Sequence, residues 1–288
     1  MFQNYLSLIK FSHTIFALPF ALVGFFLGVI HTGGDIPFDK LLYVILAMVF
    51  ARSAAMAFNR YADRKIDKAN PRTATREIAA GIIKPKNALI FIIINVFLFI
   101  FVSWLINPLC FALSPIALLV ILGYSYTKRF TSLSHYVLGI GLALSPIGAY
   151  LAVTGQFSLI PVLFSVVVFT WVAGFDIIYS LQDEQFDKSQ KLRSIPTFLG
   201  SKNALTLSSL THLLTAGVML YTINLTVNSL EPVNNLTWLG GIAFVGSLIY
   251  QHLIIKPNDL SRVNLAFFTT NGVASAIFGI LFVLDFFI

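Results

Sequence analysis

Long apolar stretches follow one another along almost the whole chain, and short polar segments separate them. A helix that crosses a bilayer needs about 20 mostly apolar residues. Nine stretches meet or approach this length: 14–31, 41–58, 88–106, 109–127, 136–154, 159–181, 203–225, 236–255 and 264–288. Their apolar positions are continuous rather than alternating, which favours helices over strands. The pattern predicts an all-α integral membrane bundle of nine transmembrane helices.

The composition agrees with a membrane protein. Of the 288 residues, 57% are hydrophobic and 11% are charged, whereas soluble domains carry about 25% charged residues. No polar linker or low-complexity segment divides the chain, so we expect a single domain over residues 1–288. The first residues lack the charged segment and small-residue cleavage site of a signal peptide, so we expect none to be removed.

Basic residues in the loops orient the bundle. With a cytoplasmic N-terminus, the cytoplasmic loops are 59–87, 128–135, 182–202 and 256–263. They hold 16 of the 19 Lys and Arg residues, while Lys10 joins them, Lys40 lies opposite and Arg52 lies within the second stretch. The positive-inside rule describes this asymmetry and supports a cytoplasmic N-terminus. We expect an integral, multi-pass protein of the bacterial inner membrane. Anionic lipid or an anionic substrate accounts for the net charge of +7, so we expect no nucleic-acid partner.

Acidic residues are rare in this chain, which has only 12, and they gather at two helix ends. The second stretch runs into Asn59, Asp63 and Asp67, and the sixth runs into Asp183 and Asp187. Residues four apart lie on one face of a helix. Each set therefore forms one column of polar side chains if the helix continues through it.

The two columns suit magnesium. Like charges four residues apart destabilise a helix, and carboxylates near a bilayer lose solvation, so a cation should compensate them. Mg²⁺ takes one or two carboxylates and completes its shell with water and phosphate oxygens. Two such sites facing each other would hold a diphosphate. The simpler alternative is that both columns are solvated helix ends within basic loops.

These motifs resemble those of the UbiA superfamily of intramembrane prenyltransferases. The first column is similar to the family pattern N-x-x-x-D-x-x-x-D, and the second to D-x-x-x-D. The resemblance covers most of the chain, since it continues through Asn70-Pro71-Arg72-Thr73, Tyr124-Ser125-Tyr126-Thr127-Lys128-Arg129 and Ser194-Ile195-Pro196. It implies nine helices around a central cavity, with the acidic loops over its mouth.

The resemblance also implies an activity, the Mg²⁺-dependent transfer of a polyprenyl group from polyprenyl diphosphate to an aromatic acceptor. The run from Gly174 to Asp183 is most similar to the 4-hydroxybenzoate polyprenyltransferase group of quinone synthesis. A naphthoate of menaquinone synthesis, or another acceptor of the superfamily, is the alternative to 4-hydroxybenzoate. The implied metal-binding residues are Asn59, Asp63, Asp67, Asp176, Asp183 and Asp187, of which Asp63, Asp67, Asp183 and Asp187 are the implied catalytic ones.

Basic and aromatic residues on the same side complete the predicted site. We expect diphosphate contacts from Lys128, Arg129, Arg64 and Arg72, although such residues also serve as topology anchors. We expect contacts with an aromatic carboxylic acid acceptor from Arg52, Arg60, Tyr124 and Tyr179. A guanidinium can hold a carboxylate through two parallel hydrogen bonds, and a tyrosine ring can stabilise a cation.

Two alternatives concern these acceptor residues and the class of protein. Arg52 can instead form an ion pair with Asp63 or Asp176, and the tyrosines can be interfacial anchors. A membrane transporter would also place acidic residues in a helical bundle. Transport sites lie near the membrane midplane, whereas these residues gather at one face, which favours the enzyme.

Overall fold

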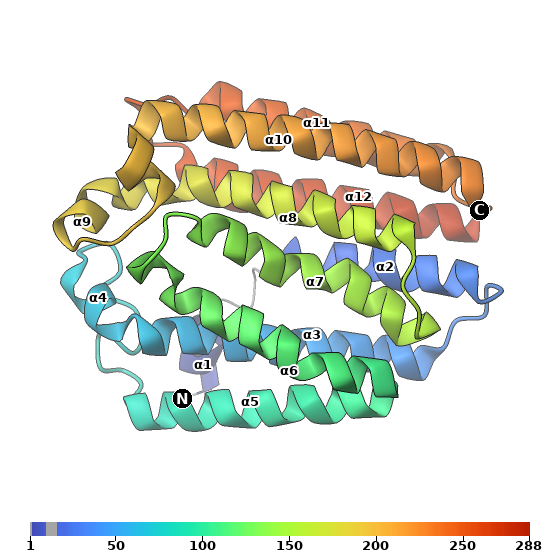
Figure 1. Ribbon diagram of the computed structural model, residues 1–288, viewed down its shortest axis with the longest axis horizontal. Coiled ribbons are helices and arrows are strands. Elements are labelled where there is room, and N and C mark those ends of the chain that lie inside the picture. The colour runs from blue at the N-terminus through green and yellow to red at the C-terminus, as the bar shows by residue number, and fades with distance from the viewer. Residues whose placement is uncertain (1, 10–15) are drawn as a thin grey trace.

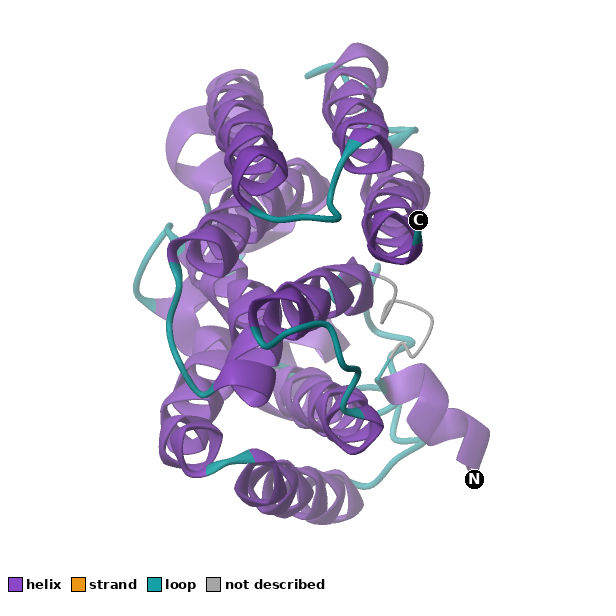
Figure 2. Cartoon of the chain, turned by 90° about the vertical axis from the view of Figure 1, so that its right-hand side faces the viewer, coloured by secondary structure: helices purple, strands orange, loops and turns teal. Residues whose placement is uncertain are grey.

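The structure is a computed structural model that describes residues 2–9 and 16–288. Within these residues it contains helices and loops, with no β-strand beyond an isolated bridge between Lys256 and Asp259 (Figure 2). The α-helices, in order, are α1 (Phe2–Leu8), α2 (Leu18–His31), α3 (Phe38–Ala62), α4 (Arg64–Ala69), α5 (Pro85–Ile106), α6 (Pro108–Gly123), α7 (Ser134–Thr154), α8 (Leu159–Ser180), α9 (Glu184–Ser189), α10 (Ile195–Ser229), α11 (Asn235–Ile254) and α12 (Asn271–Phe287).

The predicted transmembrane bundle is confirmed. In the described part of the chain, eight helices are long and apolar enough to cross a bilayer, and α2 is a shorter apolar helix that completes the expected nine. The first two positions of the predicted stretch 14–31, and Lys10, lie outside the described residues. The 14 residues of α2 extend about 21 Å, which is less than the roughly 30 Å hydrocarbon core.

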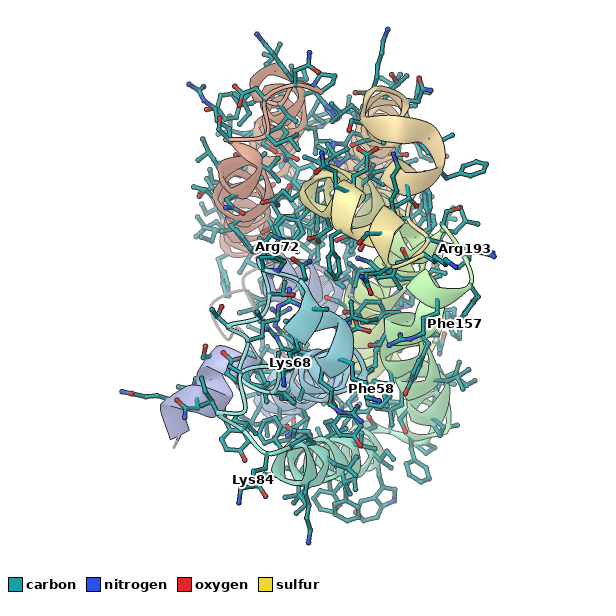
Figure 3. All side chains as sticks on the ribbon, turned by 90° about the vertical axis from the view of Figure 1, so that its left-hand side faces the viewer. Phe58, Lys68, Arg72, Lys84, Phe157 and Arg193 are labelled. Atoms are coloured by element: carbon teal, nitrogen blue, oxygen red, sulfur yellow. The ribbon has the colours of Figure 1, made fainter. Side chains whose placement is uncertain are left out.

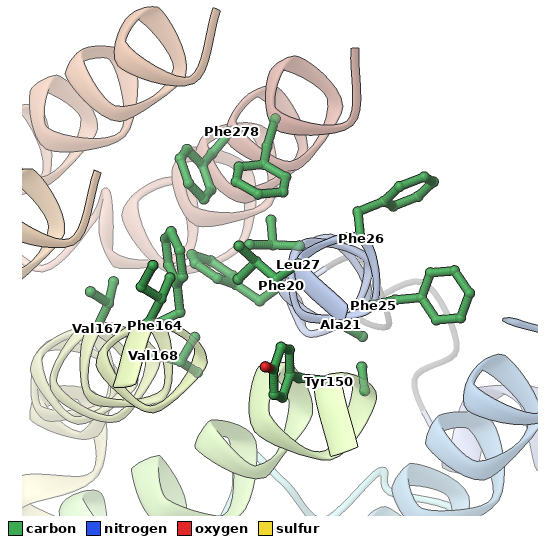
Figure 4. Packing of buried hydrophobic residues seen from close by; sticks show 14 of the residues in the cluster. Phe20, Ala21, Phe25, Phe26, Leu27, Tyr150, Phe164, Val167, Val168 and Phe278 are labelled. Carbon is green, nitrogen blue, oxygen red and sulfur yellow. The ribbon is translucent and has the colours of Figure 1, made fainter. Parts of the chain in front are cut away.

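Helix α2 runs through the middle of the bundle, and ten of its 14 residues are buried. Figure 4 shows its side chains between α7, α8 and α12, where Phe20 meets Phe278 with ring centroids 5.6 Å apart. Gly24 lies so close to α7 that an added Cβ would be 2.0 Å from the Pro146 carbonyl oxygen. Because lipid tails are as apolar as these side chains, close packing holds such helices together.

The outer helices α5, α6, α10 and α11 present large apolar side chains outward. Phe97, Leu119, Leu213 and Leu253 are each about two-thirds or more exposed. Exposed apolar surface on this scale marks a surface that contacts lipid or a partner. Together with the span lengths, it identifies an integral, multi-pass membrane protein.

Both acidic motifs lie where a long helix breaks and a short one follows. Helix α3 ends at Ala62 and α4 starts at Arg64, so the condition of one continuous helix through Asp63 is not met. The spacing nevertheless persists, because the Asp63 amide bonds the Asn59 carbonyl at 2.9 Å and the Asp67 amide bonds that of Asp63 at 2.8 Å. In the second motif, α8 ends at Ser180, residues Leu181–Asp183 form a 3₁₀ turn, and α9 follows.

The two breaks lie at the same end of the bundle. Figure 1 shows α4 and α9 together at the left, with the C-terminus at the opposite end. Figure 3 looks onto this end, where Lys68, Arg72, Lys84 and Arg193 are labelled. The fold therefore gathers acidic motifs and basic loops, which are distant in sequence, on one face.

Candidate functional site

A cavity of about 680 Å³ lies between the two acidic motifs. It is lined by α3, α4 and the loop that follows, by α8 and α9, and by a 3₁₀ turn at Tyr124–Arg129. All six predicted metal-binding residues line it: Asn59, Asp63, Asp67, Asp176, Asp183 and Asp187. The fold thus brings both columns to one space.

In the first motif, arginines from other segments hold the carboxylates. Arg129 donates to Asp63 Oδ1 at 2.8 Å, and the Asn59 amide donates to Asp63 Oδ2 at 3.3 Å. Arg76 donates to Asp67 Oδ1 at 2.7 Å. Burial raises the pKa of both carboxyl groups, and the attraction of Arg129 and Arg76 opposes this shift. The arginines therefore compensate only part of the cost of burying these charges.

In the second motif, the loop after α4 reaches across the cavity. Arg72 donates from Nε to Asp183 Oδ1 at 2.8 Å and from Nη2 to Oδ2, which is a bidentate pair. The Asn70 amide adds a bond to Asp183 Oδ1 at 3.1 Å. Lys128 Nζ lies 3.9 Å from Asp187 Oδ2. The pair between Arg72 and Asp183 ties the two motifs together.

Asp176 has a partner of a different kind. Its Oδ2 lies 2.7 Å from Nδ1 of His135, which is fully buried. The backbone N–H of Ile195 donates to the other ring nitrogen of His135 at 3.4 Å. This contact assigns the proton to Nδ1, so His135 donates to Asp176 and orients its carboxylate along the cavity wall.

The carboxylate oxygens of the cavity suit a divalent cation. Asp67 Oδ2 and Asp187 Oδ2 are buried and lack a hydrogen-bond partner among the described residues. A buried charged oxygen without a donor is costly. No group of three or more His, Cys, Asp or Glu side chains is close enough to enclose a metal within the described residues. The arrangement suits Mg²⁺, which binds through one or two carboxylates and takes its other oxygens from water and substrate.

The comparison with known families agrees with this geometry. The sequence model of the UbiA prenyltransferase family matches residues 17–273, almost the entire chain. This chain belongs to the UbiA prenyltransferase family. The resemblance inferred from the acidic motifs is confirmed.

Several UbiA relatives are similar over most of their length. A protein of Aliivibrio salmonicida named 4-hydroxybenzoate octaprenyltransferase is 31% identical over 83% of this chain and 81% of its own, and one of the same name from Tolumonas auensis is 30% identical over 84% and 83%. The apo structure of a UbiA homologue from Aeropyrum pernix matches with a TM-score of 0.84, 31% identity and coverage of 95% and 98%. A homologue from Archaeoglobus fulgidus bound to GPP and Mg²⁺ shares the fold, with a TM-score of 0.74, 19% identity and coverage of 99% and 100%.

A second, apolar cavity of about 410 Å³ adjoins the polar one in this UbiA-family bundle. Helices α2, α3, α5, α6 and α7 line it. Arg52 and Tyr124 line both cavities, so they stand at the junction between the polar and the apolar space. A ligand with a charged head and an apolar tail would pass this junction.

The other predicted basic residues are placed differently. Arg60 is buried and lines the polar cavity, but its Nη1 lies 3.7 Å from Oε2 of Glu77. Arg64 donates to the Tyr61 carbonyl at 2.7 Å and is absent from the described residues that line the polar cavity. The assignments of Arg60 to the acceptor and of Arg64 to the diphosphate stay predictions.

Sequence reasoning did not assign several residues that line the polar cavity or support it. Arg76, His135, Asn70, Phe267 and Phe268 all contact predicted site residues. Of these, Asn70 lies in the run Asn70-Pro71-Arg72-Thr73, which carries part of the family resemblance. The others carry no spacing signal, because their partners lie on separate segments.

Proposed function

We propose that this chain transfers a polyprenyl group from polyprenyl diphosphate to 4-hydroxybenzoate in quinone biosynthesis. One observation carries the proposal: the two acidic motifs line one cavity, and each of the four predicted catalytic aspartates has a basic partner there. The names of the bacterial relatives support this acceptor. The single catalytic domain over residues 1–288 is part of the proposal.

The diphosphate would bind between the two motifs. Mg²⁺, held by Asp63 and Asp67 on one side and Asp183 and Asp187 on the other, would neutralise the charge of the leaving diphosphate as a Lewis acid. The complex of the Archaeoglobus fulgidus homologue with GPP and Mg²⁺ supports this cofactor. Asn59 and Asp176 line the same wall and would assist.

The basic residues supply the remaining positive charge. Ion pairs join the carboxylates of the site to Arg72, Arg129 and Lys128. If a metal ion bound those carboxylates, the same cations would be available to bind phosphate oxygens. Arg76, on Asp67, belongs to this group. Cations fixed where negative charge develops stabilise the transition state in a site that excludes water.

The reaction exchanges one bond for another. The allylic carbon–oxygen bond breaks, and the diphosphate leaves with the electron pair. A ring carbon of the acceptor donates an electron pair to the allylic carbon. That ring carbon then releases its proton to the departing diphosphate, which restores aromaticity. The surrounding bundle would keep water from the allylic cation, and the apolar cavity would accommodate the first part of the prenyl tail.

Arg52 would hold the acceptor carboxylate. It lies at the junction of the two cavities with Tyr124, where the acceptor ring would meet the allylic carbon. A guanidinium matches a carboxylate in shape and charge. Tyr179 also lines the polar cavity, and its hydroxyl accepts a hydrogen bond from Arg72 at 3.0 Å.

Product analysis tests the proposal. Membranes containing the protein are incubated with geranyl diphosphate, Mg²⁺ and a panel of phenolic and naphthoic acids, and the products are identified by mass. We expect prenylated 4-hydroxybenzoate as the main product. A naphthoate product would assign the chain to menaquinone synthesis, and the absence of any prenylated acid would overturn the proposal.

The proposed orientation in the bacterial inner membrane places the N-terminus, and with it the mouth of the polar cavity, in the cytoplasm. Nine spans then put the C-terminus outside. Alkaline phosphatase, which is active only outside the cytoplasm, should therefore be active when fused after Ile288. An inactive fusion would contradict this orientation.

A further inference from the structure

One turn of helix near the cavity departs from α-helical geometry. Residues Leu265–Thr270 form a π-helical turn that leads directly into α12. Such turns are rare and are frequently found at functional sites. This turn carries Phe267 and Phe268, which both line the polar cavity.

The side chain of Asn271 holds this turn. Its amide nitrogen donates to the carbonyl oxygens of Ala266 at 3.2 Å and Phe267 at 3.0 Å. Its carbonyl oxygen accepts from the Trp171 indole at 2.8 Å and from the Gln251 amide at 2.7 Å. Asn271, Trp171 and Gln251 are all fully buried. One side chain therefore joins the π turn to α8, α11 and α12.

Phe267 packs against Tyr179, a residue predicted to contact the aromatic acceptor. Its ring stacks on Tyr179 with centroids 4.1 Å apart and an interplanar angle of 29°, and it meets Phe175 edge-on at 5.1 Å. Phe268 meets Tyr179 edge-on at 5.8 Å. These four residues form one wall of the cavity, the aromatic wall. Aromatic rings attract one another in stacked and edge-to-face arrangements, so the ring of an aromatic ligand would pack favourably against this wall.

We propose that Asn271 is a positioning residue for the acceptor: by fixing the π turn, it holds Phe267 against Tyr179 and so shapes the aromatic wall on which the acceptor ring packs. The inference rests on the proposed function, because the ligand of the wall is the aromatic acceptor. Asn271 acts through Phe267 and does not line the cavity among the described residues.

The contacts of Asn271 explain why a polar side chain occupies this buried place. A π turn shifts its carbonyl groups out of the α-helical register, and buried carbonyl groups need donors. A leucine of similar size would leave the Ala266 carbonyl, the Trp171 indole and the Gln251 amide without this partner. The turn would then relax toward another geometry, and Phe267 would move relative to Tyr179.

The test compares Asn271→Leu with Asn95→Leu. Asn95 is also buried, its amide donates to a carbonyl one turn earlier, Phe91, at 2.8 Å, and it is absent from the described lining of both cavities. We expect Asn271→Leu to raise the acceptor KM about ten-fold or more, since small displacements in a site have large effects. The KM for geranyl diphosphate should stay within about two-fold, and Asn95→Leu should change neither.

Two milder variants keep the test decisive if Asn271→Leu does not insert. Phe267→Leu removes the ring from the wall, and Trp171→Phe removes one anchor of Asn271; both should raise the acceptor KM selectively. An unchanged acceptor KM in the variants that insert would overturn the role of Asn271 while leaving the proposed function intact. Wild-type protein that prenylates no aromatic acid would instead overturn the proposed function.

Discussion

Each carboxylate at the mouth of the cavity has its own cation. Asp63 has Arg129, Asp67 has Arg76 and Asp183 has Arg72. A charge buried without a partner is far more costly than a paired one, so these cations stabilise the site before any ligand binds. Ligand binding would exchange these partners, because a metal ion can bind the carboxylates and the phosphate groups can bind the cations.

Removing one of these carboxylates should abolish turnover. Asp183→Asn removes a metal-binding oxygen and the ion pair with Arg72. In the first motif, Asp63→Asn removes a metal-binding oxygen and the ion pair with Arg129. We expect each to lower kcat by at least about 100-fold, the usual cost of losing a group that stabilises developing charge. The measurement is prenyl transfer by equal amounts of membrane-inserted protein.

Glu184→Gln is the matched control for Asp183. Glu184 is the next residue, bonds Lys188 at 2.6 Å and lies outside the described lining of the cavity. It should retain wild-type turnover. Full activity of Asp183→Asn, or equal loss in both variants, would contradict the assignment.

Arg52 should determine affinity for the acceptor. Arg52→Ala removes the guanidinium at the junction of the cavities, and a desolvated carboxylate left without its partner loses about 1–3 kcal/mol. We therefore expect the acceptor KM to rise about 5- to 150-fold, while the KM for prenyl diphosphate changes little. Steady-state kinetics with each substrate varied in turn measures this, with the exposed Arg262→Ala as control. A change confined to the KM for prenyl diphosphate would assign Arg52 to the phosphate site.

At the scale of helices, the two breaks place the acidic motifs. If α3 continued straight through Asp63, the first column would extend away from the bundle end. The break turns α4, so Asp67 is buried and Arg72 in the following loop reaches Asp183. The equivalent break between α8 and α9 buries Asp187. Two short helices thus close one end of the bundle.

Close packing of α2 on α7 should be sensitive to a single methyl group. Gly24→Ala would place Cβ 2.0 Å from a backbone oxygen of Pro146, so the helices must separate. Overpacking of this kind costs about 1–3 kcal/mol. We expect a lower Tm in detergent than for the wild type.

Gly217→Ala on α10 is the comparison for Gly24. An added Cβ there meets nothing within 4 Å, and alanine favours a helix over glycine by up to about 1 kcal/mol. Its Tm should equal or exceed that of the wild type. Equal Tm values for both variants would show that α2 and α7 tolerate separation.

At the scale of the molecule, the metal should serve catalysis rather than folding. Because a protein cation already accompanies each of the four catalytic carboxylates, we expect the bundle to fold without Mg²⁺. Excess chelator should therefore abolish prenyl transfer and leave the Tm nearly unchanged. Mg²⁺ together with a non-reactive prenyl diphosphate analogue should raise the Tm, since ligands that bind the native state stabilise it. Full turnover in chelator would contradict the use of a metal.

Much of the fold could be predicted from local patterns. The lengths of the apolar stretches and the placing of basic loops depend on neighbouring residues and on the thickness of a bilayer. The four-residue spacing of Asn59, Asp63 and Asp67 survives the helix break, because the backbone hydrogen bonds across it keep that spacing. The shared cavity was therefore foreseeable from two motifs at corresponding helix ends.

The partners of those residues required the three-dimensional structure. Arg129 and Asp63 are 66 residues apart, and Arg72 and Asp183 are 111 apart. Many basic residues occupy these loops, and sequence offers no rule for choosing among them. The same holds for Asp285, a buried acid near the C-terminus that accepts hydrogen bonds from the Asn234 and Thr237 amides at the start of α11. Local spacing predicts which residues share a helix face, whereas long-range pairing depends on how the helices pack.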